Sequence, residues 1–182
     1  MEKMNKSKKN PYEIPPFPDS FPVEAPDYFN FGYDVIDRWA EKDRNKLAMI
    51  WRNQHGEEKH FTFHDLSRLS NQAANLLIKH GISKGDRVFL MLPRLPEWWI
   101  FSIALIKLGA IQCPSPTLLT PHDLEFRVKF GKFKMVITDT ENAYKFDEIY
   151  DECPSLASRL LVDGERPNWI SYRAEISGPN AK

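Results

Sequence analysis

Hydrophobic positions follow two spacings that alternate along most of the chain, one typical of helices and one typical of buried strands. Helical spacing is clearest over residues 62–81, where Thr62 and Asp65 stand at the separation of a capping box and Gly81 suits the helix end. The apolar positions on one face of this segment are Leu66, Leu69, Ala73, Leu76 and Leu77. A continuous apolar run follows over 88–92, as expected of a strand that is covered on both faces.

The same alternation repeats through the second half of the chain. Further helices are expected over 96–109, 120–131 and 143–152, and further strands over 111–113, 135–137 and 160–162. Strand centres recur every ~22 to 25 residues, which leaves room for one crossover helix between successive strands. This regular alternation predicts an α/β fold with a largely parallel, twisted sheet and flanking helices.

Three other segments precede this sheet. A helix is expected from Asn30, its cap, to about Asp43, and residues 47–52 and 59–64 flank Gly56 as in a short β-hairpin. Residues 1–27 are rich in proline, which excludes regular helix and central strand. We expect an extended arm there whose aromatic residues dock on the domain, or else a loosely ordered tail. The chain thus divides into an arm over 1–27, an α/β subdomain over 28–165 and a linker, cut short, over 166–182.

Composition favours a cytoplasmic globular protein. The 25 Lys and Arg residues balance the 25 Asp and Glu residues, so electrostatics indicate no nucleic-acid partner. The basic N-terminal run leads into prolines, which argues against a secretory signal, and no apolar stretch approaches the ~18 residues of a membrane span. Cys113 and Cys153 form no cluster with the histidines, so we expect free thiols and no metal site.

Three sequence segments carry a family resemblance that extends from about Phe29 to Trp169. Residues 61–111 read FTFHDLSRLSNQAANLLIKHGISKGDRVFLMLPRLPEWWIFSIALIKLGAI. This string resembles adenylate-forming enzymes, in which a Thr-rich strand, a helix, a KGDRV turn and an LP-x-x-PEW stretch follow in the same order. The segments FNFGYDVIDRWAEKD and DECPSLASRLLV resemble the medium-chain acyl-CoA synthetase branch of that superfamily.

The resemblance implies an enzyme that uses ATP, Mg²⁺ and CoA to convert a medium-chain or short branched carboxylic acid into its acyl-CoA, through an acyl-adenylate. In this family a loop that reads approximately Ser-Gly-Thr-Thr-Gly-x-Pro-Lys surrounds the phosphates. The eight glycines of this chain form no such cluster, and Gly131-Lys132 lacks a following hydroxyl residue. We therefore place no catalytic and no metal-binding residue here, and expect none of these ligands to bind this chain tightly.

One ligand contact is expected nonetheless. In related synthetases the loop after the strand at 111–113 approaches the CoA nucleotide, and the residues at that place are Pro116, Thr117, Leu118 and Leu119. The alternative is a plain strand-to-helix connection. Adjacent helical residues cannot face the same sheet, so we expect one of Trp98 and Trp99 to pack in the core. The other should face the arm or the rest of the enzyme.

The leading hypothesis is an N-terminal fragment of an AMP-forming acyl-CoA synthetase that is inactive alone. The rival is a naturally short, non-catalytic α/β module for binding or interaction. Sequencing beyond codon 182 separates the two, because an immediate stop codon contradicts the fragment. In a fragment, the helices expected over 62–81 and 96–109 leave an apolar surface exposed, and self-association follows.

Overall fold

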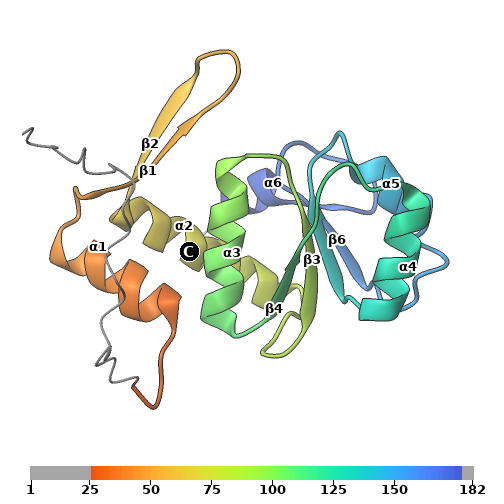
Figure 1. The fold of residues 1–182 in the computed structure, drawn as a ribbon, viewed down its shortest axis with the longest axis horizontal. Coiled ribbons are helices and arrows are strands. Elements are labelled where there is room, and N and C mark those ends of the chain that lie inside the picture. The colour runs from red at the N-terminus through yellow and green to blue at the C-terminus, as the bar shows by residue number, and fades with distance from the viewer. Residues whose placement is uncertain (1–25, 178–182) are drawn as a thin grey trace, which may run out of the picture.

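Five parallel strands form the central sheet of the structure, a computed structural model that describes residues 26–177. They lie in the order β4-β3-β5-β6-β7, and every neighbouring pair is parallel (Figure 1). The strands are β3 (Arg87–Met91), β4 (Ile111–Pro114), β5 (Met135–Thr138), β6 (Ser158–Leu161) and β7 (Ile170–Ser171). A separate antiparallel hairpin consists of β1 (Leu47–Arg52) and β2 (Glu58–Thr62). The predicted α/β fold with a short hairpin is confirmed, whereas the predicted arm lies outside the described residues except for Pro26 and Asp27.

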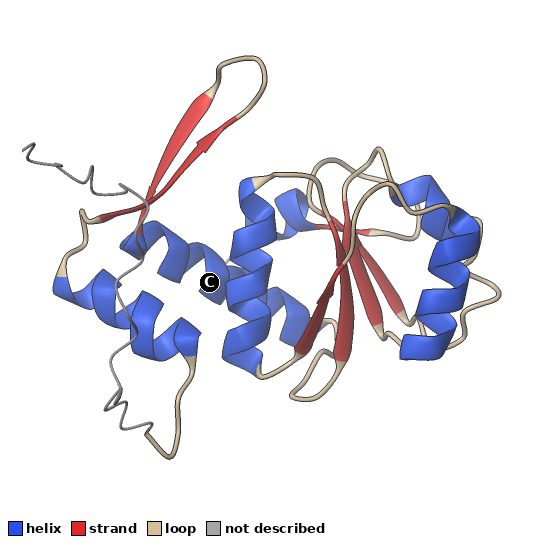
Figure 2. Ribbon diagram, viewed as in Figure 1, coloured by secondary structure: helices blue, strands red, loops and turns tan. Residues whose placement is uncertain are grey.

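Helices cover both faces of this sheet (Figure 2). The helical elements are η1 (Gly32–Asp37), α1 (Arg38–Lys42), α2 (Phe63–Lys79), α3 (Pro96–Leu108), α4 (Pro121–Gly131), α5 (Ala143–Asp147) and α6 (Tyr172–Ser177). Side chains alternate along β3, so that Val88 and Leu90 pack in a core with α2, α3 and α6, while Phe89 and Met91 pack in a second core with α4 and α5. Burial on both faces explains why this strand reads as a continuous apolar run.

The two best-capped helices begin where the sequence predicts. At the start of α2, the Thr62 hydroxyl accepts a hydrogen bond from the Asp65 backbone N–H at 3.1 Å, and the Asp65 carboxylate accepts one from the Thr62 N–H at 3.0 Å. Thr120 and Asp123 repeat this capping box at the start of α4. Each box satisfies two N–H groups that the helix itself leaves without partners, which fixes the first turn in both cases.

A buried lysine fastens the N-terminal helical segment to the rest of the structure. The Lys107 side chain is 1% exposed, and its ammonium lies 2.7 Å from a carboxylate oxygen of Asp37 at the end of η1. Gly32 permits this approach, because a Cβ at that position would lie 2.4 Å from Cγ of Lys107. Asn30 caps the segment by accepting a hydrogen bond from the Gly32 N–H at 2.9 Å. The helical segment predicted from Asn30 to about Asp43 is present, but its first part, η1, is a π-helix and only α1 is an α-helix.

Several predicted boundaries differ from the structure. The hairpin strand expected over 59–64 ends at Thr62, because the capping box starts α2 at Phe63. The helix expected over 143–152 ends at Asp147, because the backbone then tightens into i to i+3 hydrogen bonds that turn Ile149 and Cys153 into the core. Within the segment expected to be a linker, residues 170–177 form β7 and α6. Trp169 and Tyr172 are buried on opposite faces of the sheet, and burial of two large aromatic side chains accounts for the order of this stretch.

Candidate functional site

The candidate site lies at the carboxyl ends of β3 and β4, between the loops that follow these two strands. From β3 the chain turns to α3 on one face of the sheet, whereas from β4 and β5 it turns to α4 and α5 on the other face (Figure 1). Connections that leave neighbouring parallel strands toward opposite faces open a crevice between them. In open α/β sheets, ligands bind in such crevices, outside the carboxyl ends of the strands.

A groove of about 620 Å³ occupies this position. Its lining consists of Leu92, Pro93, Arg94, Trp98, Trp99, Pro116, Thr117 and Leu118. Three of the four residues predicted to contact CoA thus lie together, opposite the loop after β3. The fourth, Leu119, is absent from the groove lining and packs instead against the core beside α4 and α5. The groove wall is mainly apolar.

The two tryptophans of the groove differ in burial, and one of them packs against the core, as the sequence predicts. Trp98 packs against the core that contains α2 and α3, whereas Trp99 is 40% exposed. Their rings meet edge to face, with centroids 5.2 Å apart and an interplanar angle of 67°. This arrangement holds both rings in defined positions and leaves aromatic surface free for a ligand. Leu118, which is 91% exposed, stands on the opposite rim of the groove.

Lysine 145 holds the loop after β4 in place. Its ammonium donates hydrogen bonds to the Thr117 carbonyl at 2.6 Å and to the Asn142 side-chain oxygen at 2.9 Å. The Asn142 amide in turn donates to the carboxylate of buried Asp139 at 2.7 Å. The backbone N–H of Ser115 donates to the Leu90 carbonyl at 2.9 Å, which ties the loop to β3. Sequence reasoning missed Lys145, because 28 positions separate it from Thr117.

The loop after β3 is fixed from the hairpin side. The Trp51 indole N–H donates a hydrogen bond to the Arg94 carbonyl at 2.6 Å, which attaches the projecting hairpin to this loop. A second cavity of about 740 Å³ lies between the hairpin and residues 93–97, and it shares Pro93 and Arg94 with the groove. Among residues 26–177, no carboxylate forms an ion pair with the Arg94 guanidinium. The Arg94 side chain lines the groove at its rim.

The titratable groups near the groove suit binding more than chemistry. Arg94 is the one charged residue in the lining, and the lining contains no carboxylate, histidine or thiol. Cys113, in β4, is a free thiol whose pKa is raised by burial, so it is not an activated nucleophile. Within the described part of the chain, no group of three or more His, Cys, Asp or Glu side chains has the arrangement of a metal site. None of the helices described is long and apolar enough to cross a membrane.

Comparison with known proteins places this chain in a family. The family model described as AMP-binding enzyme matches residues 36–180. Acyl-coenzyme A synthetase ACSM5 of Rattus norvegicus, named as mitochondrial, is 41% identical over 156 residues, which cover 82% of this chain and 27% of that protein. The mitochondrial acyl-coenzyme A synthetase ACSM4 of the same species is 37% identical over 155 residues, with 81% and 27% covered. The chain thus spans 27% of the length of these curated relatives.

A solved structure shows the same arrangement of elements. The anthranilate CoA ligase AuaEII, crystallised with anthranoyl-AMP, superposes with a TM-score of 0.75 at 25% sequence identity. The match covers 84% of this chain and 29% of that one. The resemblance to adenylate-forming acyl-CoA synthetases that the sequence indicates is confirmed by the family model, by the relatives and by this structure. The chain therefore belongs to the AMP-binding enzyme family.

Proposed function

We propose that this chain is the N-terminal α/β part of an AMP-forming acyl-CoA synthetase. The complete enzyme would join a carboxylic acid to ATP, forming an acyl-adenylate and releasing pyrophosphate. The CoA thiol would then take the acyl group and release AMP. The observation that carries the proposal is the groove of Trp98, Trp99 and the loop 116–118, in a chain whose relatives are named acyl-CoA synthetases. A medium-chain or short branched acid is the proposed substrate.

We assign the groove to CoA because its residues suit that molecule. Exposed aromatic surface on Trp99 and the apolar side chain of Leu118 suit the adenine ring or the pantetheine arm. The Arg94 guanidinium at the rim suits a phosphate, since guanidinium groups bind phosphate oxygens through paired N–H donors. Lys145 holds the loop at the Thr117 carbonyl and so acts as a positioning residue. CoA supplies the thiol that receives the acyl group.

ATP and Mg²⁺ are assigned to parts of the enzyme outside the described residues. The described carboxylates provide no cluster of three groups for a metal, and the glycines provide no loop that could surround a triphosphate. The work of these residues would then be to bind and orient CoA, so we expect this chain alone to bind CoA weakly and to catalyse neither half-reaction. The predicted cytoplasmic location stays a prediction, and the names of both curated relatives place those proteins in mitochondria.

Tryptophan fluorescence during titration with CoA tests the assignment. Wild-type protein should give a saturable change, because two of its five tryptophans line the groove. Leu118→Asp should weaken binding several-fold, since it places a negative charge beside an anionic ligand. Ile78→Asp is the matched control: it adds the same charge at a 54% exposed position on α2, outside the groove, and should leave binding unchanged. Equal effects of the two substitutions, or no response from folded wild-type protein, would overturn the assignment.

A further inference from the structure

The outer face of α4 carries a stacked pair of exposed aromatic side chains. Phe126 is 69% and Phe130 is 81% exposed, and their rings stack with centroids 6.0 Å apart at an interplanar angle of 13°. Leu124 and Val128, which are fully buried, occupy the opposite side of the helix. The sequence instead predicts exposed apolar surface on α2 and α3, where the large exposed side chains are Ile78 and Trp99 alone. An aromatic pair turned away from its own core indicates an interaction surface.

A hollow lies beside this pair, on the same face of the molecule. It has a volume of about 580 Å³ and runs between α4 and the edge strand β4. The residues that line it include Phe89, Phe126, Phe130, Gly131 and Phe133. Phe133 lies directly over Gly131, where a Cβ would come within 2.3 Å of its ring, and it meets Phe89 edge to face at 5.0 Å. The face therefore offers both projecting rings and an aromatic hollow.

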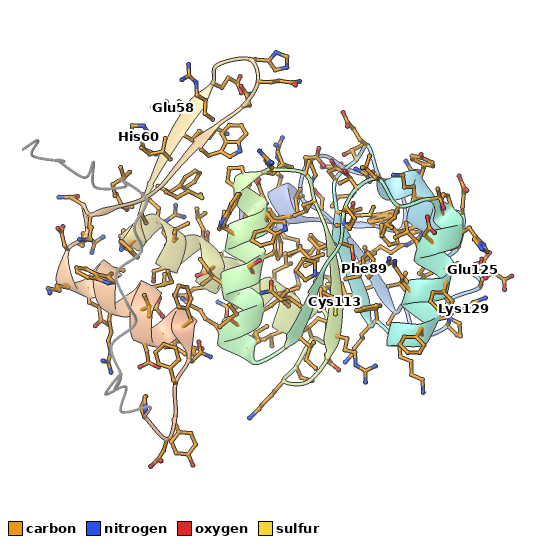
Figure 3. All side chains as sticks on the ribbon, viewed as in Figure 1. Glu58, His60, Phe89, Cys113, Glu125 and Lys129 are labelled. Atoms are coloured by element: carbon orange, nitrogen blue, oxygen red, sulfur yellow. The ribbon has the colours of Figure 1, made fainter. Side chains whose placement is uncertain are left out.

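Charges on α4 are ordered along the helix. Asp123 and Glu125 lie in its N-terminal half, and Arg127 and Lys129 lie in its C-terminal half. Figure 3 shows Glu125 and Lys129 on the outer side of α4. When two such helices lie antiparallel, the acidic half of each faces the basic half of the other, whereas a parallel arrangement brings like charges together. A surface with a projection, a hollow and both signs of charge in this order is complementary to itself.

We propose that two copies of this chain pair through α4, antiparallel about a two-fold axis. Phe126 and Phe130 of each copy lie in the hollow of the other. The edge of β4 is a poor alternative, because Pro114 lacks the N–H group that continued sheet pairing would need. The pairing is independent of the proposed CoA groove, since the groove shares no lining residue with the hollow.

Sedimentation velocity across a range of concentrations tests the pairing. Wild-type protein should show a monomer–dimer equilibrium, and the double variant F126A/F130A should raise the dimer dissociation constant at least ~10-fold, since each ring is lost twice per dimer. Alanine favours helix, so α4 should persist, and circular dichroism checks this. Ile78→Ala, an exposed apolar residue on α2, should leave the equilibrium unchanged. A monomeric wild type, or equal association of F126A/F130A and wild type, would overturn the proposal.

A charge exchange tests the antiparallel orientation separately. Glu125→Lys should weaken the dimer, because it places a lysine opposite Lys129 of the second copy. Adding Lys129→Glu should restore association, since the two charges are then exchanged on both helices. The pair also interacts within one helix, at 2.6 Å, so the exchange keeps an intrahelical partner for each side chain. Failure of the second substitution to restore association would contradict the antiparallel arrangement.

Discussion

Removal of the Asp37 carboxylate should destabilise this protein more than removal of any exposed ion pair. The Lys107 ammonium donates to Asp37 at 2.7 Å and to the Asn71 side-chain oxygen at 2.7 Å, and Ser67 donates to Asp37 at 2.6 Å. The Lys107 side chain is 1% exposed, so the variant Asp37→Ala leaves a charged group buried beside a neutral amide.

The magnitude follows from the cost of breaking a buried pair. Removal of one partner from such a pair typically costs ~3 to 5 kcal/mol, because the remaining charge is uncompensated. Asp37 is 22% exposed, so some water reaches the site and the lower end, ~3 kcal/mol, is expected. Glu175→Ala is the control, because it breaks an ion pair with Lys79 whose two side chains are 30% and 58% exposed. Its expected cost is below ~1 kcal/mol.

Urea denaturation followed by circular dichroism measures these free energies of unfolding. Lys107→Met in the Asp37→Ala background should recover much of the loss, because methionine fills similar space without a charge. If Asp37→Ala unfolds within ~1 kcal/mol of wild type, or if Lys107→Met brings no recovery, the buried lysine does not hold η1 as described.

Two further predictions concern protonation. The Thr62 hydroxyl and backbone N–H donate hydrogen bonds to the Asp65 carboxylate and lower its pKa. The stability that these hydrogen bonds give the folded protein is therefore fully present above the ordinary carboxyl pKa. It is lost as the pH falls through the lowered pKa of Asp65. Thr62→Ala should cost ~1 kcal/mol at neutral pH, and the gap to wild type should narrow below about pH 4 in urea titrations; parallel curves would contradict this. Burial raises the pKa of the Cys113 and Cys153 thiols, so iodoacetamide should modify both more slowly in native protein than in urea, as measured by mass spectrometry. Equal rates in the two conditions would refute the role of burial.

Local signals in the sequence were sufficient to predict the position of several helices and strands. The starts of α2 and α4 are predictable because each capping box lies within four consecutive residues. The strand β3 is predictable because burial on both faces requires a continuous apolar run. The resemblance to acyl-CoA synthetases supplied the loop 116–119, and the structure brings three of its residues to the groove.

Features that depend on distant partners could not be predicted in the same way. The Asp147 carboxylate, at the end of α5, accepts a hydrogen bond from the Trp169 indole N–H at 2.8 Å, and no local pattern records this contact. The anchor from Lys145 to the Thr117 carbonyl depends on the order of strands in the sheet, which hydrophobic spacing does not determine. The outward position of Phe126 and Phe130 could not be predicted from hydrophobic spacing either. Apolar residues in a helix are expected to face its own core.

ATP–pyrophosphate exchange tests whether this chain can form an acyl-adenylate or only contributes to CoA binding. The assay uses folded protein that responds to CoA, with Mg²⁺, ATP and either octanoate or butyrate. We expect no exchange above the protein-free control, because these residues contain no glycine-rich phosphate loop and, within 26–177, no acidic cluster for a metal. Exchange by this chain alone that depends on the carboxylic acid would show that these residues can catalyse adenylation.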